Sequence, residues 1–137
     1  MTDANADVNV LLVEDEPLNT TLAVAMLNLL GIRHVHAFAT WTQLEACLAT
    51  LPPIQLVLLD LRLPDTHDGY YILAKLRADA RFANVPIAAM TAQVMPDDVH
   101  RAEQAGFTGF LAKPLNFDRF PHSIQRLLAG ESVWELH

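Results

Sequence analysis

The stretch IQLVLLDLRLPDTHDGYY, residues 54–71, contains a continuous apolar run that ends in a carboxylate, Asp60. A run of Val, Ile and Leu without polar alternation is typical of a strand that is buried on both faces of a parallel sheet. Because an unpaired buried carboxylate is costly, Asp60 must lie where the strand meets solvent or a partner charge. The stretch therefore predicts a central strand with an acidic group at its carboxyl end.

The rest of the chain alternates short strand-like runs with helical patterns. Five apolar runs have the length of strands, and apolar residues recur at helical spacing after each of them. This alternation is typical of a parallel sheet with helices on both faces, so the sequence predicts an α/β fold of the (βα)5 type. The expected strands are residues 8–13, 32–39, 54–60, 85–90 and 107–112, and the expected helices are residues 18–29, 40–51, 69–79, 96–105 and 117–128.

Helical spacing also predicts which side chains face the core. The single cysteine, Cys47, lies in the pattern of the second helix and is interpreted as a small buried hydrophobe. One cysteine cannot form an intramolecular disulfide, which fits a reducing compartment. In the first helix, the expected inward residues are Leu18, Leu22, Ala25, Met26 and Leu29.

Length and composition indicate one folded domain. The 137 residues are 52% hydrophobic and 18% charged, which is the balance of a folded protein. We expect an N-terminal tail at residues 1–7, a domain at residues 8–129 and a C-terminal extension at residues 130–137. The net charge of −7 argues against a nucleic-acid surface. The N-terminus lacks the pattern of a signal peptide and no apolar run spans a bilayer, so we expect a cytoplasmic protein without membrane contact.

Chemically active side chains follow the predicted strands. Glu14 and Asp15 come after the first strand, Asp60 ends the third, Thr91 ends the fourth and Lys113 follows the fifth. Because ligands bind beyond the carboxyl ends of parallel strands, these groups are expected at one rim. Several carboxylates there suit a hard cation such as Mg²⁺, and the lysine and hydroxyl suit a phosphoryl group. The alternative for each single acid is a solvated side chain or a helix cap, a role that Asp15 before Pro17 could fill.

Four segments, taken together, resemble the receiver domain of two-component response regulators. They occur in the order and spacing of that family, and the resemblance extends from about residue 8 to residue 128. A single segment would be weak, whereas all four together are specific. The segments are LLVEDEPLN at residues 11–19, LVLLDLRLP with DG at residues 56–64 and 68–69, AAMTAQ at residues 88–93, and GFLAKPL at residues 109–115.

The resemblance implies a fold and a metal site. The fold would be flavodoxin-like, with a five-stranded parallel sheet in the order 2-1-3-4-5 and helices on both faces. Asp60 would accept a phosphoryl group from a histidine kinase or a histidine phosphotransfer protein. Mg²⁺, or Mn²⁺, would be held by Glu14, Asp15, Asp60 and the backbone carbonyl of Arg62. The family often has a cis peptide bond before a proline in the position of Pro114.

The resemblance also implies a switch. Lys113 and Thr91 would bind the phosphoryl oxygens, and Phe110 occupies the position of the family's switch aromatic, which reorients when Thr91 moves inward. The output would be an altered surface of the fourth helix, fifth strand and fifth helix, which binds a downstream protein target. A homodimer could form through the same surface or through the C-terminal extension, where Trp134 and Leu136 are apolar residues unusual at a chain end.

Two other functions remain open at this point. A Mg²⁺-dependent phosphatase with an aspartyl nucleophile usually has a second Asp two residues later as the general acid, and here Arg62 is in that position. The chain is therefore expected to be a signalling domain that catalyses only its own phosphoryl transfer and slow dephosphorylation. A receiver-like interaction module without phosphorylation is the second alternative.

One departure from the family is a loop after Pro64 that is longer by one residue.

Overall fold

The computed structural model describes residues 5–63, 67–92 and 95–135. These residues form one six-stranded parallel sheet in the order β2-β1-β3-β4-β5-β6, together with five α-helices and a short 3₁₀ turn. The elements are β1 Asn9–Val13, α1 Pro17–Leu29, β2 His34–Phe38, α2 Trp41–Cys47, η1 Leu48–Thr50, β3 Leu56–Asp60, α3 Gly69–Arg77, β4 Ile87–Thr91, α4 Pro96–Ala105, β5 Gly109–Ala112, α5 Arg119–Leu128 and β6 Val133–Trp134.

The α/β fold and the order of the first five strands are confirmed, but the prediction of a five-stranded sheet was wrong. Val133 and Trp134 form a sixth strand that runs parallel to β5. The chain reverses after α5 at Gly130, whose φ of 91° is in the left-handed region that glycine adopts readily. The additional strand covers the edge of β5. The division of the chain at residues 7 and 129 stays a prediction.

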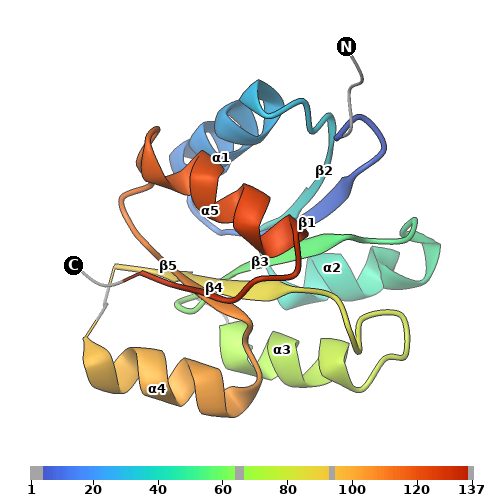
Figure 1. Ribbon diagram of the computed structural model, residues 1–137. Coiled ribbons are helices and arrows are strands. Elements are labelled where there is room, and N and C mark those ends of the chain that lie inside the picture. Colours follow the sequence, from blue (N-terminus) through green and yellow to red (C-terminus); the bar gives the residue numbers. More distant parts are fainter. Residues whose placement is uncertain (1–4, 64–66, 93–94, 136–137) are drawn as a thin grey trace.

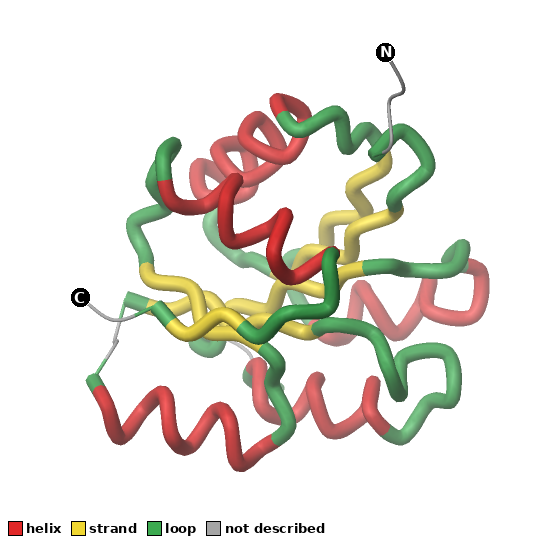
Figure 2. Tube along the Cα trace, in the orientation of Figure 1, coloured by secondary structure: helices red, strands yellow, loops and turns green. Residues whose placement is uncertain are grey.

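The sheet lies between two helical layers. Figure 1 shows α1 and α5 on one face of the sheet and α2, α3 and α4 on the other, and Figure 2 shows the strands between them. Along β1, Val10 and Leu12 belong to the core beneath α1 and α5, whereas Leu11 and Val13 belong to the core on the opposite face. Successive side chains of a strand point to opposite faces, so a strand covered on both sides must be apolar throughout.

The first helix turns a different face to the core than its leucines suggested. The side chains of Leu18 and Leu29 are 73% exposed, and the buried residues are Ala23, Met26 and Leu27. The face of α1 that contains Ala23, Met26 and Leu27 packs in the core shared with the sheet and α5, which leaves the face with Leu18 and Leu29 in solvent. The prediction that Leu18, Ala25 and Leu29 face the core was therefore wrong, whereas Met26 is buried as predicted.

The ends of the other helices follow local hydrogen bonding. Thr40 caps α2 by accepting from the Gln43 amide at 3.2 Å, as expected for a capping residue. Cys47 is exposed, contrary to the prediction, because α2 ends there and Leu48 in the following 3₁₀ turn packs against the core instead. Pro121 lies in the first turn of α5, where a missing amide is tolerated.

Among the described residues, no helix is long and apolar enough to cross a bilayer.

Candidate functional site

The register of the sheet brings the predicted polar groups to one edge. β1 pairs with β3, β3 with β4, and β4 with β5, so the carboxyl ends of these four strands are neighbours. Glu14 follows β1, Asp60 is the last residue of β3, Thr91 is the last residue of β4, and Lys113 follows β5. Side chains 99 residues apart in sequence therefore meet because parallel strands end on the same side.

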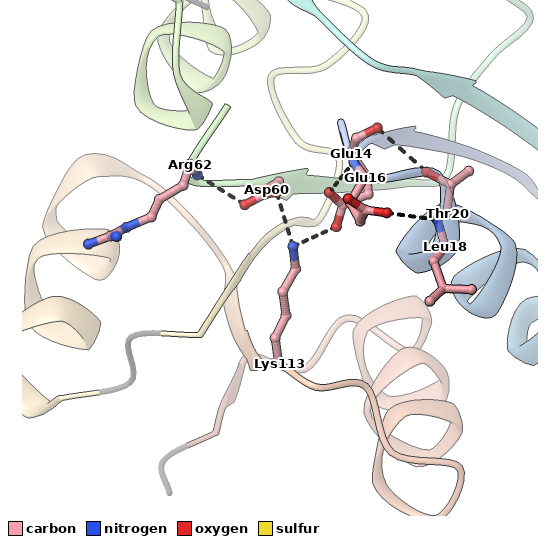
Figure 3. Close-up of polar contacts among 7 residues, drawn as sticks. All are labelled: Glu14, Glu16, Leu18, Thr20, Asp60, Arg62 and Lys113. Atoms are coloured by element: carbon pink, nitrogen blue, oxygen red, sulfur yellow. Dashed lines mark hydrogen bonds and ion pairs between the residues drawn. The ribbon is translucent and has the colours of Figure 1, made fainter. Parts of the chain in front are cut away.

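Lys113 lies between two carboxylates. Its Nζ atom is 3.0 Å from Asp60 Oδ2 and 2.5 Å from Glu14 Oε1. The exposed fractions of the side chains are 14% for Lys113, 6% for Asp60 and 2% for Glu14. Figure 3 shows the ammonium pointing at both acids. The burial of the three groups makes this pairing stronger than a surface ion pair.

Backbone amides hold the remaining carboxylate oxygens. The Arg62 amide donates to Asp60 Oδ1 at 3.0 Å, and the Glu16 amide donates to Glu14 Oε2 at 3.1 Å. Glu16 also caps α1 by accepting from the Leu18 amide, so the capping role considered for Asp15 belongs to its neighbour. Both carboxylates are thus oriented by the loops that follow their strands.

The acidic cluster fits a divalent cation. Glu14, Asp15 and Asp60 each offer a carboxylate oxygen, and these atoms lie within 4.8 Å of one another. Glu14 Oε1 has the Lys113 ion pair but no hydrogen bond within the part of the chain that the structure describes. One ammonium cannot balance three carboxylates. A hard cation with oxygen ligands suits this donor set in charge and in chemistry.

The pKa values of the cluster are displaced by burial and by mutual contact. Burial, and to a smaller extent the neighbouring Glu14, raise the pKa of Asp60 to about 6, although the Arg62 amide and Lys113 oppose the shift. Burial would also raise the pKa of Glu14, but Lys113 and the Glu16 amide hold it below its ordinary value. Burial would lower the pKa of Lys113, but the two carboxylates keep it above its ordinary value. Asp60 is therefore the acid of the cluster whose ionised form is disfavoured by its surroundings.

A pocket of about 300 Å³ opens beside these groups. Its lining includes Asp60, Lys113 and Thr91, together with the small residue Ala92. Thr91 is only 3% exposed, and its carbonyl accepts from the Lys113 amide at 2.8 Å. An anion bound in the pocket would lie beside the Lys113 ammonium, Thr91 and the Asp60 carboxylate.

Three further sequence predictions have the following structural positions. The Arg62 guanidinium points away from the acids in Figure 3 and is exposed, and the role of its carbonyl as a metal ligand stays a prediction. Phe110 is fully buried in the core on the α3 and α4 side, and its role as a switch stays a prediction. The peptide bond between Lys113 and Pro114 is cis. The longer loop at residues 64–66 and Leu136 lie outside the described residues.

The reasoning from sequence missed Gly69. A Cβ atom at this position would lie 2.6 Å from the carbonyl oxygen of Asp60 and 2.9 Å from Leu61 Cα. Only a glycine lets α3 begin this close to the end of β3. The Asp-Gly pair in the sequence marked a helix start, but the close approach depends on how the helix lies on the sheet.

The raised pKa of Asp60 predicts that the effect of Asp60→Asn on the free energy of unfolding depends on pH. A carboxyl whose pKa is raised from 3.8 to about 6 binds its proton more tightly in the folded state, so metal-free stability falls as pH rises from about 4 to 6. We expect Asp60→Asn to raise the free energy of unfolding by about 2 kcal/mol at pH 8 and to change it little at pH 4. Urea unfolding of the two proteins in EDTA, at pH 8 and at pH 4, measures these differences.

The control for this prediction is Asp79→Asn. Arg81 holds the pKa of Asp79 below its ordinary value, so removal of that carboxylate should not stabilise the protein at pH 8. A metal-free wild-type protein that gained stability relative to Asp60→Asn between pH 4 and pH 7 would contradict the sign of the shift at Asp60.

Comparison with known proteins identifies related sequences. A family model described as the response regulator receiver domain matches residues 10–125. The chain is 36% identical over 130 residues to the response regulator Rre1 of Synechocystis sp., covering 92% of this chain and 54% of Rre1. It is 31% identical over 121 residues to the polar-differentiation response regulator DivK of Brucella ovis, covering 88% of this chain and 95% of DivK. The chain thus spans about half the length of Rre1 and nearly all of DivK.

Solved structures show the same architecture. The receiver domain of a sensor histidine kinase from Pseudomonas aeruginosa PAO1, with a magnesium ion coordinated in its active site cleft, matches with a TM-score of 0.76 and 36% identity, covering 89% of this chain and 98% of that one. The chemotaxis protein CheY4 of Vibrio cholerae matches with a TM-score of 0.79 and 22% identity, covering 88% and 98%, which supports the fold alone. The family match over most of the chain, together with the relatives, shows that this protein belongs to the response regulator receiver domain family.

Proposed function

We propose that Asp60 is the phosphoryl acceptor of this receiver, that the donor is a phosphohistidine of a histidine kinase or a histidine phosphotransfer protein, and that the phosphorylated domain signals through protein contacts. The observation that carries the proposal is the position of the Asp60 carboxylate. It lies at the end of a central strand, is held by Lys113 and the Arg62 amide, and borders the open pocket. The family match and the similarity to DivK support this assignment.

The reaction follows from the geometry of Asp60. A carboxylate oxygen attacks the phosphorus atom of the donor, a P–O bond forms, the P–N bond of the phosphohistidine breaks, and its electron pair returns to the imidazole. The product is a mixed anhydride on Asp60. Bound Mg²⁺ or Mn²⁺ would supply positive charge for the phosphoryl oxygens, held by Glu14, Asp15, Asp60 and the Arg62 carbonyl. The magnesium ion in the related P. aeruginosa domain supports this choice of metal.

Lys113 and Thr91 act on the transferred group. The ammonium of Lys113 contacts Asp60 Oδ2 in the unmodified protein and would move to a phosphoryl oxygen once Asp60 is phosphorylated. The Thr91 hydroxyl would donate to a second phosphoryl oxygen. Thr91 ends β4 and Lys113 directly follows β5, which α4 and α5 contact, so these shifts would favour a second conformation of that surface, with Phe110 reorienting beneath it. A downstream protein target, or a second copy of the chain, would bind there.

Receiver domains are signalling domains, and we propose no other reaction for this one. The phosphatase alternative requires a proton donor two residues after Asp60. The side chain at that position, Arg62, points away from the acids and cannot act as a general acid at neutral pH. We also propose that the protein acts in the cytoplasm, where its phosphodonors would be found.

The test of the proposed function is the intact mass of the protein after incubation with acetyl phosphate. We expect a phosphoryl-sized mass gain that requires Mg²⁺, persists in Asp97→Asn and is absent from Asp60→Asn. Asp97 is an exposed acid on α4 and serves as the matched control. A folded wild-type protein that shows no mass gain, and does not bind beryllofluoride, would instead indicate an interaction module that works without phosphorylation.

A further inference from the structure

The described end of the chain is an extra strand on the edge of β5. The Val133 amide donates to the Thr108 carbonyl at 3.3 Å, and the Glu135 amide donates to the Phe110 carbonyl at 2.8 Å. Val133 is 3% exposed and belongs to the core beneath α5, whereas Trp134 packs against the opposite core that contains Phe110. Residues 131–135, the β6 segment, therefore occupy the sheet edge that α4 and α5 flank (Figure 1).

Glu135 anchors this segment. Its Oε1 atom accepts from the Ala112 amide at 3.1 Å, and its Oε2 atom accepts from the Ser123 hydroxyl at 2.6 Å. Arg119 Nη1 lies 3.9 Å from Oε1, and the Glu135 side chain is only 10% exposed. Hydrogen bonds to an ionised acceptor are among the stronger ones, so this carboxylate holds the segment in a specific register.

The residue that Glu135 anchors, Ala112, is the chain neighbour of Lys113 in the proposed phosphorylation site. Ala112, which donates to Glu135, directly precedes Lys113, whose ammonium contacts Asp60. The Lys113 amide donates in turn to the carbonyl of Thr91. The backbone that carries the site lysine is thus held by β4 on one side and by Glu135 on the other. A shift of Lys113 toward a phosphoryl group would disturb the Ala112 contact.

We propose that the β6 segment is an autoinhibitory strand that occupies the β5 edge in the unphosphorylated protein and is released when Asp60 is phosphorylated. The release depends on the proposed function, whereas the docking of the segment does not. Release exposes the carbonyls of Thr108 and Phe110 and the amide of Ala112, which form a template for an extended peptide. Ser123 and Arg119 beside this edge fit a carboxylate. The partner is therefore a protein segment that adds to the sheet as a strand and carries an acidic residue in the place of Glu135.

Amide hydrogen exchange of the C-terminal peptide tests the docking. In the unphosphorylated full chain, the amides of Val133 and Glu135 should be protected. We expect Glu135→Ala to accelerate their exchange at least tenfold without phosphodonor. The matched control, Glu131→Ala, removes an exposed acid of the same segment that forms an ion pair with Arg126 on α5, and it should leave exchange unchanged. Equal protection in wild type and Glu135→Ala would overturn the anchor.

A second exchange experiment tests whether phosphorylation of Asp60 releases the β6 segment. Exchange of the Val133 and Glu135 amides is compared with and without beryllofluoride and Mg²⁺, in wild type and in Asp60→Asn. If Glu135→Ala does not fold, Ser123→Ala replaces it as a milder variant that weakens the docking of the segment. A tenfold acceleration that requires Asp60 supports the proposal. If beryllofluoride binds and the amides of the β6 segment remain equally protected, phosphorylation does not release the segment. That result would leave the proposed phosphorylation of Asp60 unaffected. Failure of the Asp60-dependent mass gain overturns the proposed function and the coupling, while the Glu135→Ala comparison still decides the docking.

Discussion

Replacing Lys113 with glutamine is expected to lower the metal-free free energy of unfolding at pH 8 by about 3 kcal/mol, because it leaves two buried carboxylates without their cation. The ammonium lies within 3.0 Å of Asp60 and closer still to Glu14, and all three side chains are largely buried. The same change should slow phosphorylation by acetyl phosphate about 100-fold, because the charge that receives the phosphoryl oxygens is gone. Urea unfolding and time-resolved intact mass measure the two effects.

The matched control is the other lysine of the chain, Lys75. It is exposed on α3, where its ammonium lies over the ring of Tyr71, so Lys75→Gln makes the same charge change away from the site. We expect its effects on stability and phosphorylation to be small. Millimolar Mg²⁺ should restore part of the stability of Lys113→Gln, since a cation can replace the ammonium between the acids. A Lys113→Gln protein as stable as wild type in EDTA would contradict the buried-pair interpretation.

Replacing Gly69 with alanine is expected to lower the free energy of unfolding by about 3 kcal/mol, because the new Cβ has no space. It would lie 2.6 Å from the Asp60 carbonyl oxygen and 2.9 Å from Leu61 Cα, and both are backbone atoms that cannot rotate away. The first turn of α3 or the end of β3 must therefore move. Since Asp60 is the last residue of β3, phosphorylation should fall together with stability.

Gly106→Ala separates this steric effect from a general cost of losing glycine. No atom lies within 4 Å of a Cβ at Gly106, but its φ of 111° is in the left-handed region. We expect a loss of about 1 kcal/mol from backbone strain and an unchanged rate of phosphorylation. Urea unfolding and the mass assay compare the two variants. Normal phosphorylation and stability in Gly69→Ala would show that the β3 end and α3 can separate without cost.

The buried strands and the site acids were predictable from sequence because their signals are local. The unbroken apolar run before Asp60 indicated a strand covered on both faces, and each functional side chain stood at the end of such a run. The sheet then had to bring these ends together, since parallel strands share one carboxyl edge.

Other features depended on which surfaces meet. Leu18 and Leu29 fit a helical spacing but lie on the solvent side of α1, because the adjoining sheet and α5 select the face that contains Met26 and Leu27. The raised pKa of Asp60 results from burial and from Glu14, neither of which a sequence displays. The close approach at Gly69 depends on the angle at which α3 leaves the rim.

The α/β fold, the order of its elements and the identity of the acids, hydroxyl and lysine at the rim can all be predicted from the amino-acid sequence, because they follow from hydrophobic periodicity and from the residues at the strand ends. The sixth strand, which the apolar tail adds to its own sheet, becomes evident only from the folded arrangement. Val133 and Trp134 are too few to indicate a strand on their own, and their hydrogen bonds go to β5, more than 20 residues earlier in the chain. A contact between distant segments depends on the open edge that folding leaves, and a local pattern cannot encode it.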